Sequence, residues 1–299
     1  MHYIILDLEW NSAYCPWQKG FLNEIIEFGA VKLDENLKEV SRFQCFVRSK
    51  LTKRLRARVK GLTNITNDQM RSGISIEKAI RDYTQWAGKD TVTLTWSNTD
   101  IYVLVENLKT LMGKETIPFL YGYVDIQKYV QNRLGVTGNQ IDLGTAAEML
   151  NVNFEEFAAH RALGDSLCTA EILRRTWDSE RGLKGYVTDA TKEEYYKRLF
   201  FKPYIISDIN NPAIDKEQLR CRCPDCDDFM GRKTKWKYKN RYFIADFECK
   251  KCGKQLLGRL RFKKTYDGVV ISRSIIPPKP PKAEEEATTE NTNEANQTN

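Results

Sequence analysis

Two Cys-x-x-Cys pairs constrain the C-terminal part of this chain more tightly than any other feature of its sequence. Cys223 and Cys226 form the first pair, and Cys249 and Cys252 form the second after a gap of 22 residues. This spacing is close to that of a tetrahedral site in which four thiolates bind one structural Zn²⁺ ion. Cys221 is a surplus thiol that could replace Cys223 as a ligand. Because a four-thiolate site has no open coordination position, it would stabilise the fold and supply no chemistry.

The segment between the two cysteine pairs has the pattern of a β-strand. Four lysines alternate there with Thr234, Trp236 and Tyr238, which predicts a strand with one basic face. These lysines are Lys233, Lys235, Lys237 and Lys239. A redox dithiol is the alternative, but it would need only one pair near a β-α-β pattern. The cysteine pairs and the strand together resemble a zinc ribbon, which implies a small β-rich domain over residues 219–276.

Charge separates this domain from the rest of the chain. Residues 1–218 are neutral, residues 219–282 carry a net charge of +12, and residues 283–299 carry −5. A basic segment attracts the phosphates of a nucleic acid, although a merely solvated surface is the alternative. We therefore expect the four lysines to bind substrate. Residues 277–299 lack the large apolar side chains that could form a core and are predicted to be a disordered acidic tail.

The first 180 residues alternate between strand and helix patterns. Apolar or alternating runs predict strands at 3–8, 24–33, 42–47 and 91–96, and helical spacing predicts helices at 76–86, 101–111 and 167–177. This alternation predicts an α/β fold with a mixed sheet flanked by helices. We expect one domain over residues 1–180 and a helical linker over residues 181–218.

Acidic residues follow two of the predicted strands and open a predicted helix. Asp7 and Glu9 end the first strand, where alternation places both side chains on one face. Asp100 follows the fourth strand, and His160 precedes Asp165 by five residues as a helix opens. Solvated strand-end charges would explain the first pair alone, but they do not explain the three segments together. Carboxylate oxygens suit Mg²⁺ or Mn²⁺, whereas Zn²⁺ prefers the sulfurs of the other domain.

These segments resemble the motifs of the DEDDh 3′→5′ exonucleases of the ribonuclease H-like superfamily. Asp7 and Glu9 match the Asp-x-Glu motif, Asp100 the second motif, and His160 and Asp165 the His-x-x-x-x-Asp motif. Residues 24–31 and 62–66 are similar to two further segments of the family, and the Trp96 segment is similar to its Eri-type branch of RNA-trimming enzymes. The resemblance implies that the four acids bind two catalytic metal ions and that His160 takes the proton of the attacking water.

The resemblance also implies a substrate site. The neighbourhood of Leu8 and Trp10 would receive the terminal nucleotide, and Asn98 lies where the second motif approaches it, although Trp10 could equally be a packed core aromatic. We expect a cytoplasmic hydrolase without a membrane segment that degrades single-stranded nucleic acid, RNA in preference to DNA, to nucleoside 5′-monophosphates. A protein partner is possible. The alternatives are a nucleic-acid-binding scaffold with little turnover and an exonuclease that serves DNA proofreading or repair.

Overall fold

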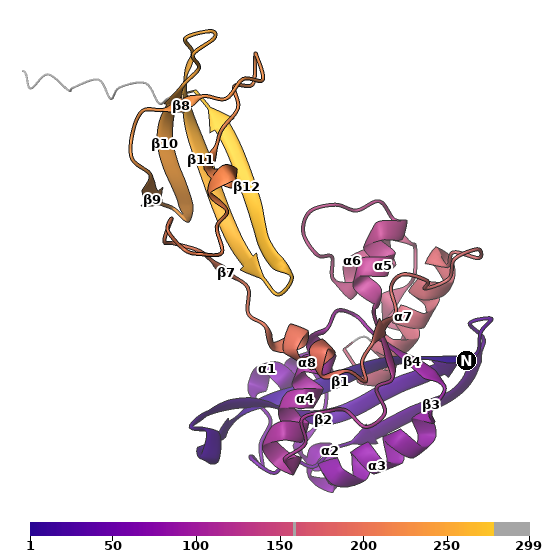
Figure 1. Cartoon of the computed structure of the whole chain (residues 1–299). Coiled ribbons are helices and arrows are strands. Elements are labelled where there is room, and N and C mark those ends of the chain that lie inside the picture. The colour runs from indigo at the N-terminus through magenta and orange to yellow at the C-terminus, as the bar shows by residue number, and fades with distance from the viewer. Residues whose placement is uncertain (158–159, 278–299) are drawn as a thin grey trace, which may run out of the picture. The chain divides into compact units, whose positions relative to one another are not determined.

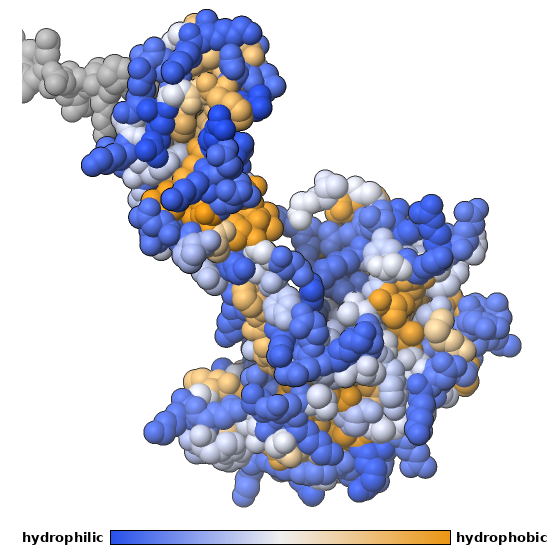
Figure 2. Space-filling model, viewed as in Figure 1, coloured by the Kyte–Doolittle hydropathy of each residue, from blue (hydrophilic) through white to orange (hydrophobic). Residues whose placement is uncertain are grey.

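A computed structural model describes residues 1–157 and 160–277 of the chain. These residues form two compact units, of which the first covers residues 1–200 and the second begins at Phe201. Apart from Pro277, the predicted acidic tail lies outside the described residues. Among the residues that the structure describes, no helix is long and apolar enough to cross a membrane. The face of the protein in Figure 2 is mostly hydrophilic, with smaller apolar areas.

The first unit is built on a mixed sheet flanked by helices, as the sequence predicts, and this sheet has six strands (Figure 1). In chain order, its strands are β1 (His2–Cys15), β2 (Gly20–Leu33), β3 (Glu39–Phe46), β4 (Thr91–Thr95), β5 (Gly122–Asp125) and β6 (Thr188–Asp189). Their order across the sheet is β3-β2-β1-β4-β5-β6. The pairs β1–β4 and β4–β5 are parallel, and the other pairs are antiparallel. The parallel pairing of His2–Ile5 with Thr91–Leu94 brings the end of β4 beside the middle of β1, close to Asp7.

Helices cover both faces of this sheet. They are α1 (Ala57–Thr63), α2 (Asn67–Ser72), α3 (Ile76–Ala87), α4 (Thr99–Met112), α5 (Ile126–Arg133), α6 (Leu143–Met149), α7 (Ala162–Thr176) and α8 (Glu193–Phe200). The predicted helices correspond to α3, α4 and α7. The sequence analysis missed β5, which is only four residues long, and the short helices α1, α2, α5 and α6, because short elements show too few periods to be recognised.

Alternation along β1 divides the core of the first unit into two clusters. Ile4, Leu6 and Leu8 pack in a cluster with residues of α3 and α4, whereas Tyr3 and Ile5 pack in a cluster with residues of α5 and α7. Asp7 and Glu9 continue the second alternation, so their side chains lie on the α7 face of the sheet. Here β1 and β2 run further than predicted and are joined through the short 3₁₀-helix η1 (Pro16–Gln18).

The second unit is a small antiparallel sheet. Its strands are β7 (Tyr204–Ile205), β8 (Gly231–Arg232), β9 (Lys237–Lys239), β10 (Tyr242–Glu248), β11 (Gln255–Thr265) and β12 (Gly268–Ile276). The order is β12-β11-β10-β8, with β7 also paired to β11 and β9 also paired to β10. Phe243, Phe247, Leu260 and Phe262 form the centre of its core. This arrangement gives the predicted β-rich domain.

Two predictions about the C-terminal half need correction. The linker expected over residues 181–218 is divided, because Tyr195 and Tyr196 of α8 are buried in the first unit while β7 pairs with β11 of the second. The basic strand is also not continuous. Arg232 lies opposite Phe247 and Lys237 opposite Ile244, so two extra residues leave the sheet between β8 and β9. This excursion lets Trp236 pack edge-on against Phe247, and it leaves Lys233 and Lys235 outside the strands.

Candidate active site

Carboxylates from segments that are far apart in the sequence meet beside the middle of β1. Asp7, Glu9 and Asp165 each offer a carboxylate oxygen within 4.8 Å of the others. Asp7 and Glu9 come from β1, and Asp165 comes from the first turn of α7. All three side chains are partly buried. Because every potential ligand is a carboxylate oxygen, this carboxylate cluster suits a hard divalent cation such as Mg²⁺ or Mn²⁺.

Asp100 lies next to the carboxylate cluster and comes from α4, which packs on the opposite face of the sheet from α7. It lies in the first turn of α4, is only 4% exposed, and accepts a hydrogen bond of 3.1 Å from the Leu8 amide, between Asp7 and Glu9. The turn before α4 contains Ser97 with φ of 72°, and the Tyr123 hydroxyl donates to the Ser97 carbonyl at 3.0 Å. The turn therefore fixes where α4 begins, and the hydrogen bond to β1 fixes where the Asp100 carboxylate lies.

Gly29 allows α7 to approach the sheet closely enough to deliver Asp165. It lies opposite Asp7 in the β1–β2 pairing. A Cβ at this glycine would be 2.0 Å from the Leu163 nitrogen and 2.1 Å from the Ala162 carbonyl carbon, both in the first turn of α7. The Ser166 hydroxyl also donates to the Gly29 carbonyl at 2.9 Å. Helix and strand are thus in backbone contact next to the carboxylate cluster.

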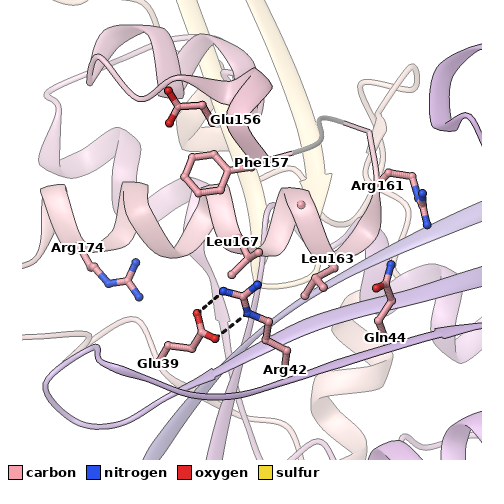
Figure 3. A pocket seen from close by; sticks show the side chains of 10 residues that line it. Glu39, Arg42, Gln44, Glu156, Phe157, Arg161, Leu163, Leu167 and Arg174 are labelled. Atoms are coloured by element: carbon pink, nitrogen blue, oxygen red, sulfur yellow. Dashed lines mark hydrogen bonds and ion pairs between the residues drawn. The ribbon is translucent and has the colours of Figure 1, made fainter.

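A buried ion pair lies beside the cluster. Glu27, opposite Glu9 in the β1–β2 pairing, is fully buried and bonded by two nitrogens of Arg161 at 3.0 and 2.7 Å. The Gln44 amide donates to the same carboxylate at 2.8 Å. Figure 3 shows Arg161 where α7 begins, with Gln44 nearby on β3. This Glu27–Arg161 pair ties the residue after His160 to the middle of the sheet.

Sequence reasoning missed Gly29, Glu27 and Arg161. One signal was available, because Glu27 interrupts an otherwise apolar run in a strand predicted to be buried, and a buried glutamate is rare unless it is paired. No local feature of the sequence identifies Arg161 as the partner of Glu27, because the two residues are 134 positions apart in the chain.

A hollow next to Arg161 is separate from the carboxylate cluster. It lies between β3 and α7 and has a volume of about 500 Å³. Arg42 and Glu39 on its wall form a two-bonded ion pair, drawn as dashed lines in Figure 3. Arg174, also on its wall, donates to the Leu37 carbonyl at 3.0 Å. Because its cations are already engaged by protein groups, the hollow does not form an anion site.

The electrostatics of the cluster favour the binding of a cation. Burial, followed by the charges of neighbouring carboxylates, raises the pKa of Asp7 well above its ordinary value and that of Glu9 to about 9. Burial also raises the pKa of Asp100 to about 7 and that of Asp165 to about 6. Carboxylates gathered in this way must hold protons or a cation near neutral pH. A divalent cation would restore their ionised form, which agrees with the nature of the ligand atoms.

His160 lies next to the cluster through its main chain. Its amide donates to Asp165 Oδ1 at 3.2 Å, and its backbone is left-handed, with φ of 62°. The imidazole is exposed and packs edge-on to Phe154, with the ring centroids 6.0 Å apart. Within the described part of the chain, no hydrogen bond joins this ring to a carboxylate of the cluster. The structure thus brings the His160 backbone to the site while its ring faces Phe154.

The three residues expected to receive the terminal nucleotide lie in different environments. Leu8 is 2% exposed, packs in the core, and donates its amide to Asp100. Trp10 is partly buried and packs against the same core cluster, as the packed-aromatic alternative expects. A β-bulge between Glu9 and Trp10 interrupts the pairing with β2 at this point. Asn98 is exposed at the start of α4, and its side chain does not cap the helix.

Four cysteines of the second unit form a separate thiol cluster. The sulfur of Cys226 lies 3.3 Å from that of Cys249 and 3.7 Å from that of Cys252, which is also 3.7 Å from the Cys223 sulfur. Four thiolates around one Zn²⁺ at about 2.3 Å would be spaced by nearly this distance. Cys221 lies outside this set and is buried in the core of the unit. The residues present therefore fit a tetrahedral zinc site.

Comparison with known proteins agrees with this geometry. The family model for exonucleases, RNase_T, matches residues 4–173. The chain is 30% identical over 179 residues to the "Probable 3'-5' exonuclease KapD" of Bacillus subtilis (strain 168), which covers 57% of this chain and 82% of KapD. The solved nuclease domain of 3'hExo, described as a DEDDh family member bound to rAMP, is 25% identical with a TM-score of 0.50, and the match covers 58% of this chain and 90% of that one.

A full-length 3'-exonuclease of known structure supports the fold alone. It is 24% identical with a TM-score of 0.51, and the match covers 58% of this chain and 59% of that one. The family match includes both the first strand and α7, and so contains all four acids of the site. The chain therefore belongs to the exonuclease family and is a 3′→5′ exonuclease of the DEDDh type.

Proposed function

We propose that the first unit hydrolyses single-stranded RNA, in preference to DNA, from its 3′ end and releases nucleoside 5′-monophosphates. The observation that supports this proposal is the convergence of Asp7, Glu9 and Asp165 within 4.8 Å, with Asp100 bonded to the strand between them. An oxygen-only set of this kind suits metal-assisted phosphodiester hydrolysis.

Asp7, Glu9, Asp100 and Asp165 would hold two Mg²⁺ or Mn²⁺ ions. When bound, such ions lower the pKa of an attacking water and neutralise the charge on a leaving 3′-oxygen. The chain itself supplies the placement of the four carboxylates, which their mutual repulsion would otherwise push apart. The Leu8 amide orients the Asp100 carboxylate. The backbone contact between Gly29 and α7 determines how closely Asp165 approaches the sheet.

His160 would accept the proton of the attacking water. Its left-handed backbone is anchored by Asp165, and in this role its exposed ring would turn from Phe154 toward the cluster. Replacing His160 by Ala should reduce turnover about 10²-fold or more, which is the usual contribution of proton transfer. The Mn²⁺ concentration for half-maximal activity should stay the same. Altered metal affinity with normal turnover at saturating Mn²⁺ would make His160 a ligand instead.

The proposed preference for RNA rests on one related structure. The related nuclease domain of 3'hExo was solved with rAMP, a ribonucleotide, which favours RNA for this chain. The Leu8 backbone and the exposed Asn98 remain candidates to contact the terminal nucleotide, and Trp10 would do so only through its exposed edge. Of the four lysines of residues 233–239, Lys237 and Lys239 of β9 remain candidates for binding the strand further along, whereas Lys233 is paired with Glu248 and Lys235 lies outside the strands. The 2′-hydroxyl would distinguish RNA from DNA at such contacts.

The second unit would hold one structural Zn²⁺ ion through Cys223, Cys226, Cys249 and Cys252. Thiols are kept reduced in the cytosol, where such a cysteine pattern is more often a metal site than a set of disulfides, so we propose a cytoplasmic location. Binding of this unit to an acidic polymer, compared with its binding to RNA, tests for a protein partner.

Hydrolysis of matched RNA and DNA strands, each labelled at the 5′ end, tests the proposed function. With Mn²⁺, the labelled strand should shorten one nucleotide at a time from its 3′ end, faster for RNA, and nucleoside 5′-monophosphates should accumulate. Replacing Asp7 by Asn should lower the rate about 10³-fold, equivalent to ~4 kcal/mol of lost stabilisation. Replacing the exposed Glu35 by Gln is the matched control and should leave the rate unchanged. A normal rate for the Asp7 variant, or cleavage of closed circles, would contradict the proposal.

A further inference from the structure

Strand β11 of the second unit has one apolar and one basic face. Leu256, Leu260 and Phe262 are buried in the core of the unit. Because successive side chains of a strand point to opposite sides, the intervening residues Arg259 and Arg261 point away from the core. Lys263 continues the same row and is exposed. Three cations therefore repeat along one face of the strand at about 6.7 Å intervals, twice the rise per residue.

The neighbouring strands extend this row. Arg259 is paired with Ile244 of β10, which is paired in turn with Lys237 of β9. Lys239 is paired with Tyr242 in the same way. All of these positions lie on the face that points away from the core, because paired residues share a face. We call the six polar members the basic sheet face. They are Lys237, Lys239, Tyr242, Arg259, Arg261 and Lys263.

An aromatic ring holds the two arginines in place. The guanidinium carbons of Arg259 and Arg261 lie 4.4 and 5.1 Å from the centre of the Tyr242 ring. Arg261 also points to the Ser272 hydroxyl of β12 at 3.4 Å. A guanidinium stacked on a ring keeps its outward edge free for further hydrogen bonds. The arginines are thus partly ordered before any ligand arrives, which lowers the entropy cost of binding.

The cations of this face are not neutralised by the protein. In the part of the chain that the structure describes, no carboxylate lies within 4 Å of any of the five. The acids on the same side of β10 lie toward the thiol cluster, where Glu248 pairs with Lys233 and Asp246 is bonded by Thr234 at 3.1 Å. Other cations of this unit are paired, as in Lys254 with Asp225 and Arg222 with Asp227. The positive charge of the basic sheet face is therefore balanced by solvent or by a ligand, and not by carboxylates of the protein.

We propose that the basic sheet face binds single-stranded nucleic acid. Its cations would contact phosphates, and the arginines and Tyr242 would stack on bases that only a single strand exposes. This proposal rests on the proposed function only in assuming that the protein meets nucleic acid. It also replaces the lysine strand expected from the sequence, because Lys233 is paired with Glu248, Lys235 lies outside the sheet, and the residues of β11 were not recognised.

Equilibrium binding by the full chain tests this proposal. The parent carries Asp7→Asn, so that a labelled, unstructured 20-nucleotide RNA is not consumed during fluorescence anisotropy. The test variant adds Arg259→Gln and Arg261→Gln, which keep the stems packed on Tyr242. The matched control adds Lys250→Gln and Lys251→Gln, two exposed lysines of the second cysteine pair that lose the same charge. Zinc content and thermal unfolding establish that each variant is folded.

We expect the arginine variant to bind RNA at least ten-fold more weakly, and the lysine control to stay within about two-fold. The slope of log K against log salt should become less negative by about 1.4 when two phosphate contacts are lost. Tyr242→Ala should weaken binding about ten-fold through lost stacking, and Tyr242→Phe should not. Should the arginine variant not fold, Lys237→Gln with Lys239→Gln removes two exposed cations of the same face and should also weaken binding.

Two results would overturn the proposal. Equal weakening by the arginine variant and the lysine control would show only a general effect of charge. Normal RNA binding by the arginine variant, with lost binding to labelled polyglutamate, would make the face a site for an acidic protein. Hydrolysis by the chain with native Asp7 is measured separately. A chain that loses RNA binding with the arginines but never hydrolyses RNA would refute the proposed function and leave this binding face in place.

Discussion

The carboxylate cluster of the first unit and the thiol cluster of the second are assembled in different ways. Asp7 and Asp165 are separated by most of the first unit and meet because a strand and a helix pack together. The thiols come from two short turns within 30 residues of one another. In each turn the residue after the second cysteine is left-handed, Asp227 with φ of 50° and Gly253 with φ of 71°. Local turn geometry builds one cluster, and tertiary packing builds the other.

This difference predicts how each cluster responds to change. A locally built site should fail when one ligand is lost, because the ligands are also its main structural support. A site built by packing should depend as strongly on residues that touch no ligand, such as Gly29 and the Glu27–Arg161 pair. Both sites gather groups that repel one another when ionised, so both need a cation to be stable in the ionised form.

The largest effect is expected for Cys226→Ser. Loss of one thiolate should abolish zinc binding, which provides ~10–16 kcal/mol in comparable small zinc domains, and the second unit should unfold. Zinc content should fall from one ion per chain to none, and turnover by the first unit at saturating substrate should stay within a few-fold. Cys221→Ala is the control, because Cys221 is a core residue outside the thiol cluster. If Cys221→Ala loses zinc and Cys226→Ser keeps it, the ligand assignment is wrong.

Arg161→Gln should be the next most damaging change. It leaves Glu27 buried with only Gln44 as a partner, and breaking a buried ion pair in this way costs about 3–5 kcal/mol. Unfolding in denaturant can be followed by tryptophan fluorescence, because five of the six tryptophans lie in the first unit. The double variant Glu27→Gln with Arg161→Gln should recover much of the stability. If the loss in free energy of unfolding for the double variant equals the sum of the losses for the two single variants, the pair is not coupled.

Gly29→Ala should affect catalysis more than stability. The added Cβ would overlap the backbone of α7, so the helix must move away from β2 and carry Asp165 with it. Overpacking costs about 1–3 kcal/mol, whereas a displacement near 1 Å in a catalytic site can lower the rate about 10²-fold. Gly61→Ala in α1 is the control, because nothing lies within 4 Å of its Cβ position. Equal rates for the two variants would show that Gly29 does not set the position of Asp165.

The smallest effect concerns pH. The folded-state pKa values of Asp165, Asp100 and Glu9 are about 6, 7 and 9, all above the ordinary values. The folded chain therefore holds more protons than the unfolded chain, so this contribution to stability is complete at acidic pH and is lost as pH rises through these values. Without added Mg²⁺, the melting temperature should fall by several degrees between pH 6 and pH 9.

Added Mg²⁺ provides the control for this pH effect. A cation that binds the ionised cluster stabilises the folded state. This stabilisation should be larger at pH 9 than at pH 6, because fewer protons compete with the cation for the carboxylates at pH 9. The measurement is the shift in melting temperature on adding Mg²⁺ at each pH. An equal shift at both values would mean that the cation binds elsewhere.

Much of the candidate site could be predicted because its ligands lie in short motifs. Asp-x-Glu in an apolar strand and His-x-x-x-x-Asp at a helix start each combine a residue pattern with a local element, although β1 continues to Cys15 and so places Asp7 and Glu9 in the middle of the strand and not at its predicted end. The long strands and helices were found for the same reason, since their apolar periods extend over many residues. Short elements such as β5, and the break between β8 and β9, were not predicted because they are defined by pairing with neighbouring strands and not by a local residue pattern.

The sequence by itself determined the α/β class of the first unit, the acids that line its site and the four thiols of the second, because local spacing encodes these features. Only the tertiary structure decided that Gly29 admits α7, that Arg161 neutralises Glu27 and that β9, β10 and β11 join their cations on one face. Each of these depends on contacts between segments far apart in the chain. Close approach, burial and strand register arise from packing, which no local pattern of residues records.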